Sequence, residues 1–189
     1  NNVVIPYGVT EIGSSAFANC VVLGSGNASV QFGSKLTSIG SSAFSATAMK
    51  NVAFAELEQS AELTIGSSAF ASCGISSIDL PEGLTEIGSY AFAYNSLSGS
   101  LVIPDSVKTI RDYAFYVSSD SKNSSLEELT LGRNLGRVGA SAFQNYIQLK
   151  TVNIRTANTG LTLGDNAFGH DQNDAYWTNR EIDGELYFV

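Results

Sequence analysis

The segment Ile12-Gly13-Ser14-Ser15-Ala16-Phe17 decides the fold, because its six-residue pattern returns along the whole chain. The later copies begin at Ile39, Ile65, Ile87, Ile110, Val138 and Leu163, and each ends in a phenylalanine. Successive motif phenylalanines lie 27, 26, 22, 23, 28 and 25 positions apart. A period in the twenties is too short for repeats made of helical pairs, so it predicts a solenoid of short stacked coils.

Two further apolar columns precede each motif. One is an apolar-x-apolar triplet, whose alternation predicts a strand with one buried and one exposed face. The other is a single apolar residue two or three positions before the motif. The triplets occupy residues 3–5, 30–32, 52–54, 78–80, 101–103, 129–131 and 152–154, with an eighth at 186–188. The single residues are Val9, Leu36, Leu63, Leu84, Val107, Leu135 and Leu161.

A coil of about 23 residues cannot bury its own apolar side, so the coils should stack at the strand spacing of about 4.8 Å. The strands would then pair in parallel, and the motif phenylalanines would form one row in the interior. These are Phe17, Phe44, Phe70, Phe92, Phe115, Phe143 and Phe168. The glycine after the first motif residue should accept either an unusual backbone angle or a close neighbouring coil. Arg111 occupies the same column, so glycine is not strictly required there.

These residues resemble the BspA-like leucine-rich repeats, whose pattern runs approximately L-x-x-I-x-[IL]-P-x-x-[VL]-x-x-I-G-x-x-A-F-x-x-C. The best match begins at Ile75-Ser76-Ser77-Ile78-Asp79-Leu80-Pro81 and ends at Phe92, and the resemblance extends from Val3 to Phe188. It implies a protein that is secreted or displayed on a bacterial cell surface. The family members with assigned roles are adhesins that bind matrix proteins or other cells.

We therefore predict a single leucine-rich-repeat solenoid domain over residues 1–189. It should contain about seven stacked coils with parallel β-strands, short second strands, and irregular or short helical turns. The first residues, Asn1 to Pro6, already read as the interior of a repeat, so we expect the chain to be a fragment of a longer protein.

The formal net charge of −8 disfavours nucleic acid as a partner, because no basic patch is available to neutralise phosphates. No apolar run approaches the length of about 18 residues that would insert into a membrane. A protein ligand is the expected partner, on the extracellular matrix or another cell surface. The oligomeric state stays open, with a monomer favoured.

Four tyrosines form the first candidate binding site. Tyr90 and Tyr113 occupy the same column in adjacent coils, and Tyr94 and Tyr116 are near them in sequence. Tyrosine is frequent at protein interfaces because it combines a large apolar area with a polar tip. The alternative is a local packing ladder that covers the edge of the core.

The exposed face of the strands is the second candidate. One outward row should contain Ser29, Asn51, Ser77, Ser100, Glu128 and Thr151, and the other Gln31, Ala53, Asp79, Val102, Thr130 and Asn153. Asp79, Val102 and Thr130 are the binding candidates on this face. A smooth, extended face suits a large partner rather than a small molecule, although such a face can also be inert.

Four segments are longer than the regular repeat: residues 21–29, 55–62, 117–125 and 169–184. Insertions in a solenoid often form loops on its binding side. The alternative is a tolerated surface insertion, since long loops cost little additional closure entropy.

The chain offers little for catalysis or metal binding. Cys20 and Cys73 lie in the same column two coils apart, which is too far for a disulfide, so we expect two small buried thiols. The single histidine, His170, lies in a polar loop, and no serine lies in a G-x-S-x-G motif. Asp165, Asp171, Asn173 and Asp174 weakly suggest a calcium loop but fail the EF-hand pattern.

We accordingly expect no enzymatic activity, no cofactor and no bound metal. The sequence favours a cell-surface or secreted module for protein binding and adhesion. The alternative function is a structural spacer that displays another domain. The two differ in whether changes at the tyrosines reduce binding.

Overall fold

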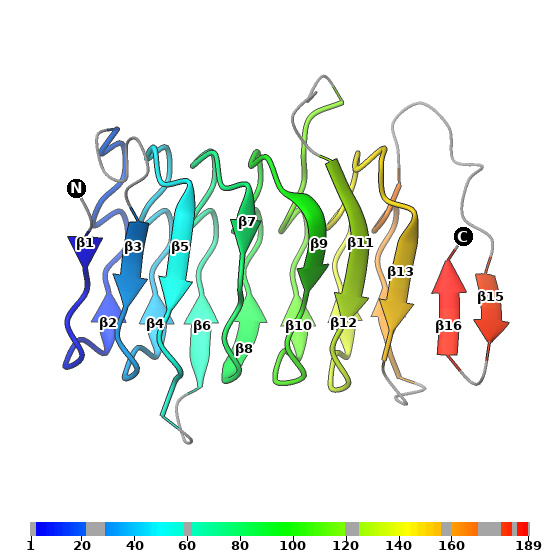
Figure 1. Ribbon diagram of the computed structural model, residues 1–189, viewed down its shortest axis with the longest axis horizontal. Coiled ribbons are helices and arrows are strands. Elements are labelled where there is room, and N and C mark those ends of the chain that lie inside the picture. Colours follow the sequence, from blue (N-terminus) through cyan, green and yellow to red (C-terminus); the bar gives the residue numbers. More distant parts are fainter. Residues whose placement is uncertain are drawn as a thin grey trace.

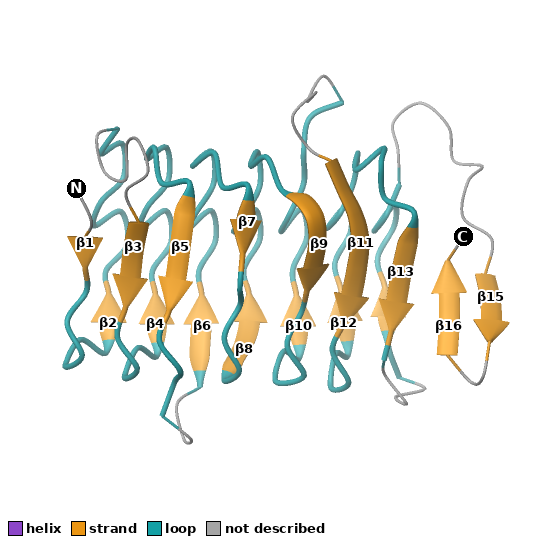
Figure 2. Cartoon of the chain, viewed as in Figure 1, coloured by secondary structure: helices purple, strands orange, loops and turns teal. Residues whose placement is uncertain are grey.

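The computed structural model describes residues 3–21, 29–58, 62–119, 125–155 and 160–169, together with the backbone of 179–182 and 185–188. Within these residues the chain forms an elongated solenoid of stacked coils, which run from left to right in Figure 1. Each coil passes down a front strand, around a tight corner, up a back strand and over a series of turns. Strands and irregular turns make up all the described secondary structure, as Figure 2 shows.

The strands form two rows. The front row consists of β1 (Val3–Val4), β3 (Ser29–Phe32), β5 (Asn51–Phe54), β7 (Ser77–Ile78), β9 (Ser98–Val102), β11 (Ser125–Leu131) and β13 (Thr151–Ile154). The back row consists of β2 (Glu11–Ile12), β4 (Ser38–Ile39), β6 (Leu63–Ile65), β8 (Leu84–Ile87), β10 (Thr109–Ile110), β12 (Arg137–Val138) and β14 (Thr162–Leu163). The chain then adds β15 (Asn179–Ile182) and β16 (Glu185–Phe188).

The back row is one seven-stranded parallel sheet, in which the first motif residue of each coil pairs with that of the next. These seven back strands define the seven coils, numbered here in chain order. The front row is divided between β7 and β9. One sheet has the order β1-β3-β5-β7, and the other has the order β9-β11-β13-β16-β15. The prediction of a parallel-strand leucine-rich-repeat solenoid is therefore confirmed.

The last strand departs from the predicted pattern. The triplet at 186–188 was expected to continue the parallel front row, but β16 pairs antiparallel with β13. β16 is one arm of a hairpin with β15 and not the front strand of an eighth coil. Only two residues connect the arms, and so short a connection joins antiparallel strands.

The interior contains a continuous row of phenylalanine rings. Consecutive ring centroids are between 4.9 and 5.7 Å apart, with nearly parallel planes, from Phe17 at one end to Phe168 at the other. The five inner rings are fully buried, whereas Phe17 and Phe168 are half-buried. The ring spacing follows the strand spacing of about 4.8 Å, so one geometry repeats along the axis. Burial of each inner ring contributes about 1.5–3 kcal/mol.

The glycine column is explained by close stacking and not by unusual backbone angles. A Cβ atom on Gly88 would lie 2.6 Å from the carbonyl carbon of Gly66 and 2.7 Å from the nitrogen of Ser67. Among the described glycines, those with positive φ are Gly74, Gly83 and Gly99, which lie outside this column. Arg111 takes the column in the fifth coil, and its N–H still donates to the Ile87 carbonyl at 2.9 Å.

Candidate binding surfaces

The candidate tyrosines lie on turns that lead from each back strand to the next front strand. In every coil the residue two places before the motif phenylalanine has a left-handed backbone, with φ between 53° and 59°. These residues are Ser15, Ser42, Ser68, Tyr90, Tyr113, Ser141 and Asn166. Such angles are uncommon for residues that carry a Cβ atom. Because all seven coils share them, the angle is a requirement of the coil and does not by itself indicate a function for the tyrosines.

Hydrogen bonds between coils hold this conformation. The N–H of Ser68 donates to the Ser89 carbonyl at 2.9 Å, and that of Tyr90 donates to the Asp112 carbonyl at 3.2 Å. The N–H of Tyr94 in the same way reaches the Tyr116 carbonyl at 2.8 Å. The turns are thus tied to their neighbours along the solenoid axis, and the side chains that they carry are presented on a rigid backbone.

The four tyrosines form one cluster on the fourth and fifth coils, called here the tyrosine surface: Tyr90, Tyr94, Tyr113 and Tyr116. The rings of Tyr90 and Tyr113 are stacked, with centroids 4.8 Å apart. Tyr116 contacts both Tyr113 and Tyr94 edge-on, at 5.6 and 5.5 Å. Tyr94 is 50% exposed and the other three are half-buried. The rings therefore pack on one another and still present aromatic area to solvent.

The hydroxyl of Tyr90 stays protonated over the physiological pH range. Burial raises the pKa of this phenol above its usual value, and the nearby phenols of Tyr113 and Tyr94 and the Asp112 carboxylate raise it further. A protonated phenol both donates and accepts hydrogen bonds. The centre of the tyrosine surface therefore offers a neutral hydrogen-bonding group among aromatic rings.

The three candidates on the front strands do not join the tyrosine surface. Asp79 follows β7 in the first front sheet, whereas Val102 and Thr130 pair with each other in the second. Asp79 is exposed and Val102 is 49% exposed. Thr130 was expected to face solvent but is only 6% exposed. Val102 and Asn153 flank it on the neighbouring strands, so this short side chain has little area left for solvent.

The two cysteines are both free, in agreement with the prediction of no disulfide. Cys73 is buried, but Cys20 is exposed, which corrects the expectation of two buried thiols. The first coil packs against a described neighbour on one side only, so a column that is buried further along the solenoid is open at Cys20. Burial raises the pKa of the Cys73 thiol, which therefore stays protonated.

A buried polar row surrounds Cys73. The Thr47 hydroxyl donates to Cys73 Sγ at 3.3 Å, and Cys73 Sγ donates to the Phe44 carbonyl at 3.1 Å. Asn95 accepts the N–H groups of Cys73 and Ile75 and donates to the carbonyls of Phe70 and Phe92. These side chains satisfy backbone groups that the turns leave inside the protein. The row therefore has a structural role. Its one signal in the sequence is the position that Thr47, Cys73 and Asn95 share, three residues after a motif phenylalanine.

Tyr146, in the same column of the sixth coil, is also buried. Its hydroxyl has no hydrogen-bond partner among the described residues. Burial raises the pKa of this phenol far above its usual value, so it remains neutral.

The residues weighed and disfavoured as a calcium loop or a catalytic histidine fall mostly outside the described residues. His170, Asp171, Asn173 and Asp174 are among those that the structure leaves undescribed, and Asp165 is exposed. Among the residues that are described, no three histidine, cysteine, aspartate or glutamate side chains come together as a metal site. That part of the chain also contains no helix of the length and hydrophobicity needed to cross a membrane.

The hollows on the described surface include one over the back sheet and one at the front corner. One, of about 550 Å³, lies over the back sheet and is lined by the serines and glycines of the motif, with Glu86 and Arg111 at one side. The other, of about 430 Å³, lies at the front corner between the segments that follow β5 and β7. The repeat pattern predicted neither hollow, although the second borders the insertion at 55–62.

Comparisons with known proteins agree with this architecture. A leucine-rich repeat protein from Eubacterium ventriosum is 26% identical, with a TM-score of 0.56 over 89% of this chain and 50% of that protein. A leucine rich cell surface protein from Faecalibacterium prausnitzii is 24% identical, with a TM-score of 0.56 over 99% of this chain and 51% of the other. A leucine-rich repeat protein from Bacteroides ovatus is 23% identical, with a TM-score of 0.54, covering 86% and 47%. The chain thus spans about half the length of each of these structures.

No curated protein matches the chain. The family pattern described as the BspA type leucine rich repeat region matches six copies, over residues 1–119 and 55–173. The six copies of the family match and the seven back strands cover the same array of coils. The repeat spacing, the parallel coils and this match together show a repeat module of the protein-interaction type. The chain belongs to the BspA type leucine-rich repeat family.

Proposed function

We propose that this chain is a non-catalytic adhesion module, displayed outside the cell, that binds a protein ligand through the tyrosine surface. It would form one solenoid domain within a longer protein. The name of the similar Faecalibacterium prausnitzii protein supports a location at the cell surface. The ligand would be a protein of the extracellular matrix or of another cell.

The observation that carries this proposal is the stacked arrangement of Tyr90 and Tyr113, with Tyr94 and Tyr116 beside them. In the same column the other coils carry serine or asparagine, so the aromatic residues are confined to the fourth and fifth coils. Tyrosine rings contribute large contact areas at interfaces. Because these rings already contact one another, little side-chain entropy remains to be lost on binding.

The rest of the described surface favours a protein over a small molecule. Both hollows are open and shallow, whereas sites for small molecules bury most of their ligand. The net charge of −8 opposes nucleic acid. The exposed face of the front strands is extended and mostly uncharged. Solenoids commonly contact large partners through faces of this kind.

The test uses a substitution that the fold itself tolerates in this column. Tyr90→Ser/Tyr113→Ser places the residue of Ser42 and Ser68 at the same left-handed position. The control is Ser42→Ala/Ser68→Ala, two changes in the same column of the second and third coils. Each protein is measured by surface plasmon resonance against purified matrix proteins and by adhesion to intact host cells. The tyrosine variant should bind at least about tenfold more weakly, the loss that removal of central interface tyrosines commonly causes.

The alternative is a spacer with no ligand of its own. A spacer would show no saturable binding to any matrix protein or cell, and neither pair of substitutions would have an effect. If binding occurs but is equally strong in wild type and the tyrosine variant, the module is an adhesin whose site is elsewhere. Circular dichroism should show that both variants remain folded.

A further inference from the structure

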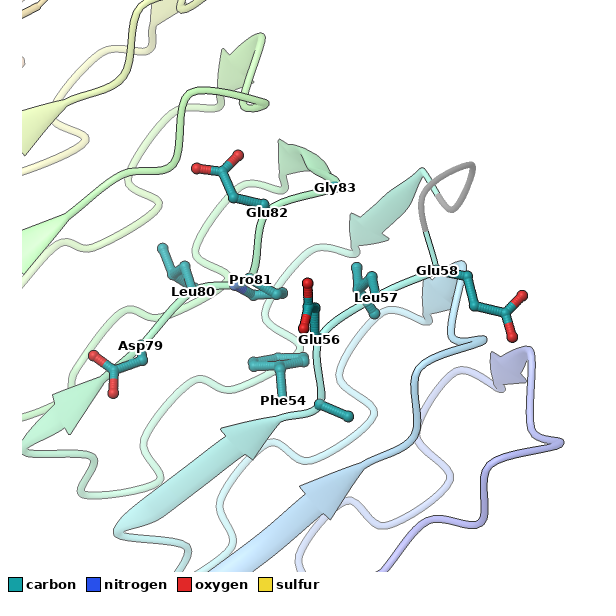
Figure 3. A pocket seen from close by; sticks show the side chains of 10 residues that line it. Phe54, Glu56, Leu57, Glu58, Asp79, Leu80, Pro81, Glu82 and Gly83 are labelled. Atoms are coloured by element: carbon teal, nitrogen blue, oxygen red, sulfur yellow. The ribbon is translucent and has the colours of Figure 1, made fainter.

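The hollow at the front corner exists because the third and fourth coils differ in length there. Eleven positions separate Val52 from Leu63 in the third coil, but only six separate Ile78 from Leu84 in the fourth. The two coils therefore cannot follow the same path around the corner. Figure 3 shows the segment after β5 and the segment after β7 on opposite sides of the resulting hollow.

Proline removes one of the hydrogen bonds that would join the two segments. The N–H of Ala55 donates to the Phe32 carbonyl at 3.0 Å and so continues the ladder between the second and third coils. Pro81 occupies the corresponding position in the fourth coil and has no N–H to donate to the third. The pairing of β5 with β7 accordingly ends at Val52 and Ile78.

The walls of the hollow are apolar. Phe54, Leu57, Leu80 and Pro81 line it. Leu57 is buried, and the Phe54 ring is held by stacking on Phe32, with centroids 4.9 Å apart. Phe54, Leu80 and Pro81 are half-buried, so apolar surface remains accessible on both sides. An aliphatic chain lying in the hollow would contact apolar surface on both sides.

Two of the four carboxylates around these walls are already engaged. Glu58 accepts a hydrogen bond from the Tyr7 hydroxyl at 2.6 Å and lies 3.8 Å from Lys35 Nζ. Glu82 accepts the N–H groups of Asp105 and Ser106, each at 3.3 Å. Figure 3 shows both side chains pointing away from the centre of the hollow.

Glu56 and Asp79 are the other two. Both are exposed, one on each segment, and neither has a hydrogen bond or ion pair with any described residue. The undescribed neighbours Gln59, Ser60 and Ala61 carry no charge. Figure 3 shows the Glu56 side chain beside Phe54 and Pro81, whereas the Asp79 side chain points away from the centre. The hollow therefore has an apolar interior and a negative rim, with one uncompensated carboxylate beside it and a second on its outer edge.

We infer that this hollow binds a lysine or arginine side chain of a protein partner. The inference rests on the proposed function, since it specifies the chemistry of a protein ligand at a second surface. Lysine and arginine combine an aliphatic stem with a cationic tip. The stem would lie between Phe54 and Leu80, and the tip would lie near the Glu56 carboxylate, with Asp79 adding negative charge on the outer side of the opposite segment.

The apolar walls distinguish this ligand from a simple cation. A metal ion would need several oxygen ligands converging on one point, and no such group of three acids exists among the described residues. A second copy of this chain is disfavoured by mutual repulsion, because each copy carries a net charge of −8. A basic side chain of a partner would place its aliphatic stem against the apolar walls and its positive charge near the negative rim.

The test uses a short acetylated and amidated peptide with one central lysine between alanines. Matched peptides carry norleucine, which keeps the stem without the charge, or glutamate. Binding to the full chain is followed by NMR chemical-shift titration of the methyl groups of Leu57 and Leu80. The lysine peptide should shift both methyl groups saturably, the norleucine peptide more weakly, and the glutamate peptide not at all.

The matched variants remove the same charges at two places. Glu56→Gln/Asp79→Asn neutralises the rim, whereas Glu11→Gln/Asp165→Asn removes one glutamate and one aspartate that are exposed elsewhere. Loss of the attraction between the lysine tip and these exposed carboxylates predicts about a fivefold loss of affinity for the lysine peptide in the rim variant only. The affinity of wild type should also fall as the salt concentration rises.

Equal losses in both variants would show general attraction to an acidic protein and overturn the assignment. So would the absence of methyl shifts at millimolar lysine peptide, or shifts that calcium causes and the peptide does not. The tyrosine surface plays no part in this titration. Failure here, together with a clear effect of Tyr90→Ser/Tyr113→Ser on matrix binding, would leave the proposed function standing. The reverse result would remove the proposed function and keep the hollow.

Discussion

The first coil and the central coils carry the same motif in different surroundings. Phe17 in the first coil is half-buried, whereas Phe92 in the fourth is fully buried between two stacked rings. A Cβ on Gly13 would meet nothing within 4 Å, but one on Gly88 would overlap the backbone of the third coil. The motif therefore sets the path of a coil, while the neighbouring coils supply the burial.

This difference has a thermodynamic consequence. In a solenoid, stability is approximately a sum of terms for single coils and for the interfaces between neighbours. Equivalent substitutions in the first and central coils change the coil term alike and the interface term differently. Each matched pair below therefore measures what stacking adds to the motif.

The largest difference is expected between Cys20 and Cys73, which share one column. Thiolates react and thiols do not, and Cys73 is both buried and held as a thiol by the rise in its pKa. Cys20 should react with an aromatic disulfide reagent within seconds to minutes. Cys73 should react at least about a thousandfold more slowly, as expected if opening the structure around Cys73 costs about 4 kcal/mol or more. Rates are read by absorbance at pH 8, with Cys20→Ser and Cys73→Ser variants to assign the phases.

Alkaline pH supplies a second measure of the same burial. Because burial raises the pKa of Cys73 in the folded protein above its ordinary value of 9.0, this thiol stabilises the fold fully below that pH. The stabilisation declines as pH rises through 9 and towards the folded pKa. In the thiol-reagent assay, equal reaction rates for Cys20 and Cys73 in native buffer would show that the third coil opens as readily as the first.

The next largest difference is expected in the phenylalanine row. Phe92→Ala removes a ring stacked at 5.2 Å on both Phe70 and Phe115 and should destabilise the protein by about 3–5 kcal/mol. Phe17→Ala removes a half-buried ring with one stacked neighbour, at 5.0 Å, and should cost about half as much. Urea unfolding followed by circular dichroism gives both values. Equal losses would mean that the row is not the common core of the coils.

Glycine substitutions test the close approach of the coils. Gly88→Ala would place a Cβ 2.6–2.8 Å from three backbone atoms of the third coil, which cannot move aside independently. We expect a loss of about 1–3 kcal/mol, typical of overpacking. Gly13→Ala meets open space and should be neutral or stabilise by up to about 1 kcal/mol, since alanine restricts the unfolded chain. The same urea measurements decide, and a neutral Gly88→Ala would show that the coils can separate locally.

The interior was predictable from sequence because its positions repeat. Phe44 and Leu36 recur at fixed places in each coil, and parallel stacking brings such equivalent residues together without further information. The close stacking at Gly88 was one of two open explanations. The structure selected it because the positive φ angles fall on residues such as Ser68 instead.

The surface was less predictable, since it depends on differences between coils. The left-handed angle at Tyr90 is imposed by hydrogen bonds along the axis, and a tyrosine gives no local signal for it. Cys20 was expected to be buried because the column is, but burial requires neighbours on both sides. The hollow near Glu56 arises from a mismatch in length between two coils, and its shape cannot be read from either coil alone. The sequence predicted that the four tyrosines lie near one another, and their role in binding stays a prediction.

The smallest expected difference concerns exposed charges on the back sheet. Glu86 and Glu11 occupy the same column, but only Glu86 forms an ion pair, with Arg111 of the next coil. The carboxylate of Glu86 raises the pKa of Arg111 through a hydrogen bond and through its charge, so the attraction is direct. Both side chains are more than a third exposed, and solvent screens them, so Glu86→Gln should cost only about 0.2–1 kcal/mol.

The matched change Glu11→Gln should cost nothing measurable, and the difference between the two variants should shrink in about 1 M salt, where charges are screened within about 3 Å. Thermal unfolding at low and high salt measures both effects. If the Glu86 variant loses the same stability at high salt, the carboxylate contributes through packing against the fifth coil and not through charge. The difference in stability between the two coils would then come from packing contacts alone, both at the exposed back sheet and in the buried phenylalanine row.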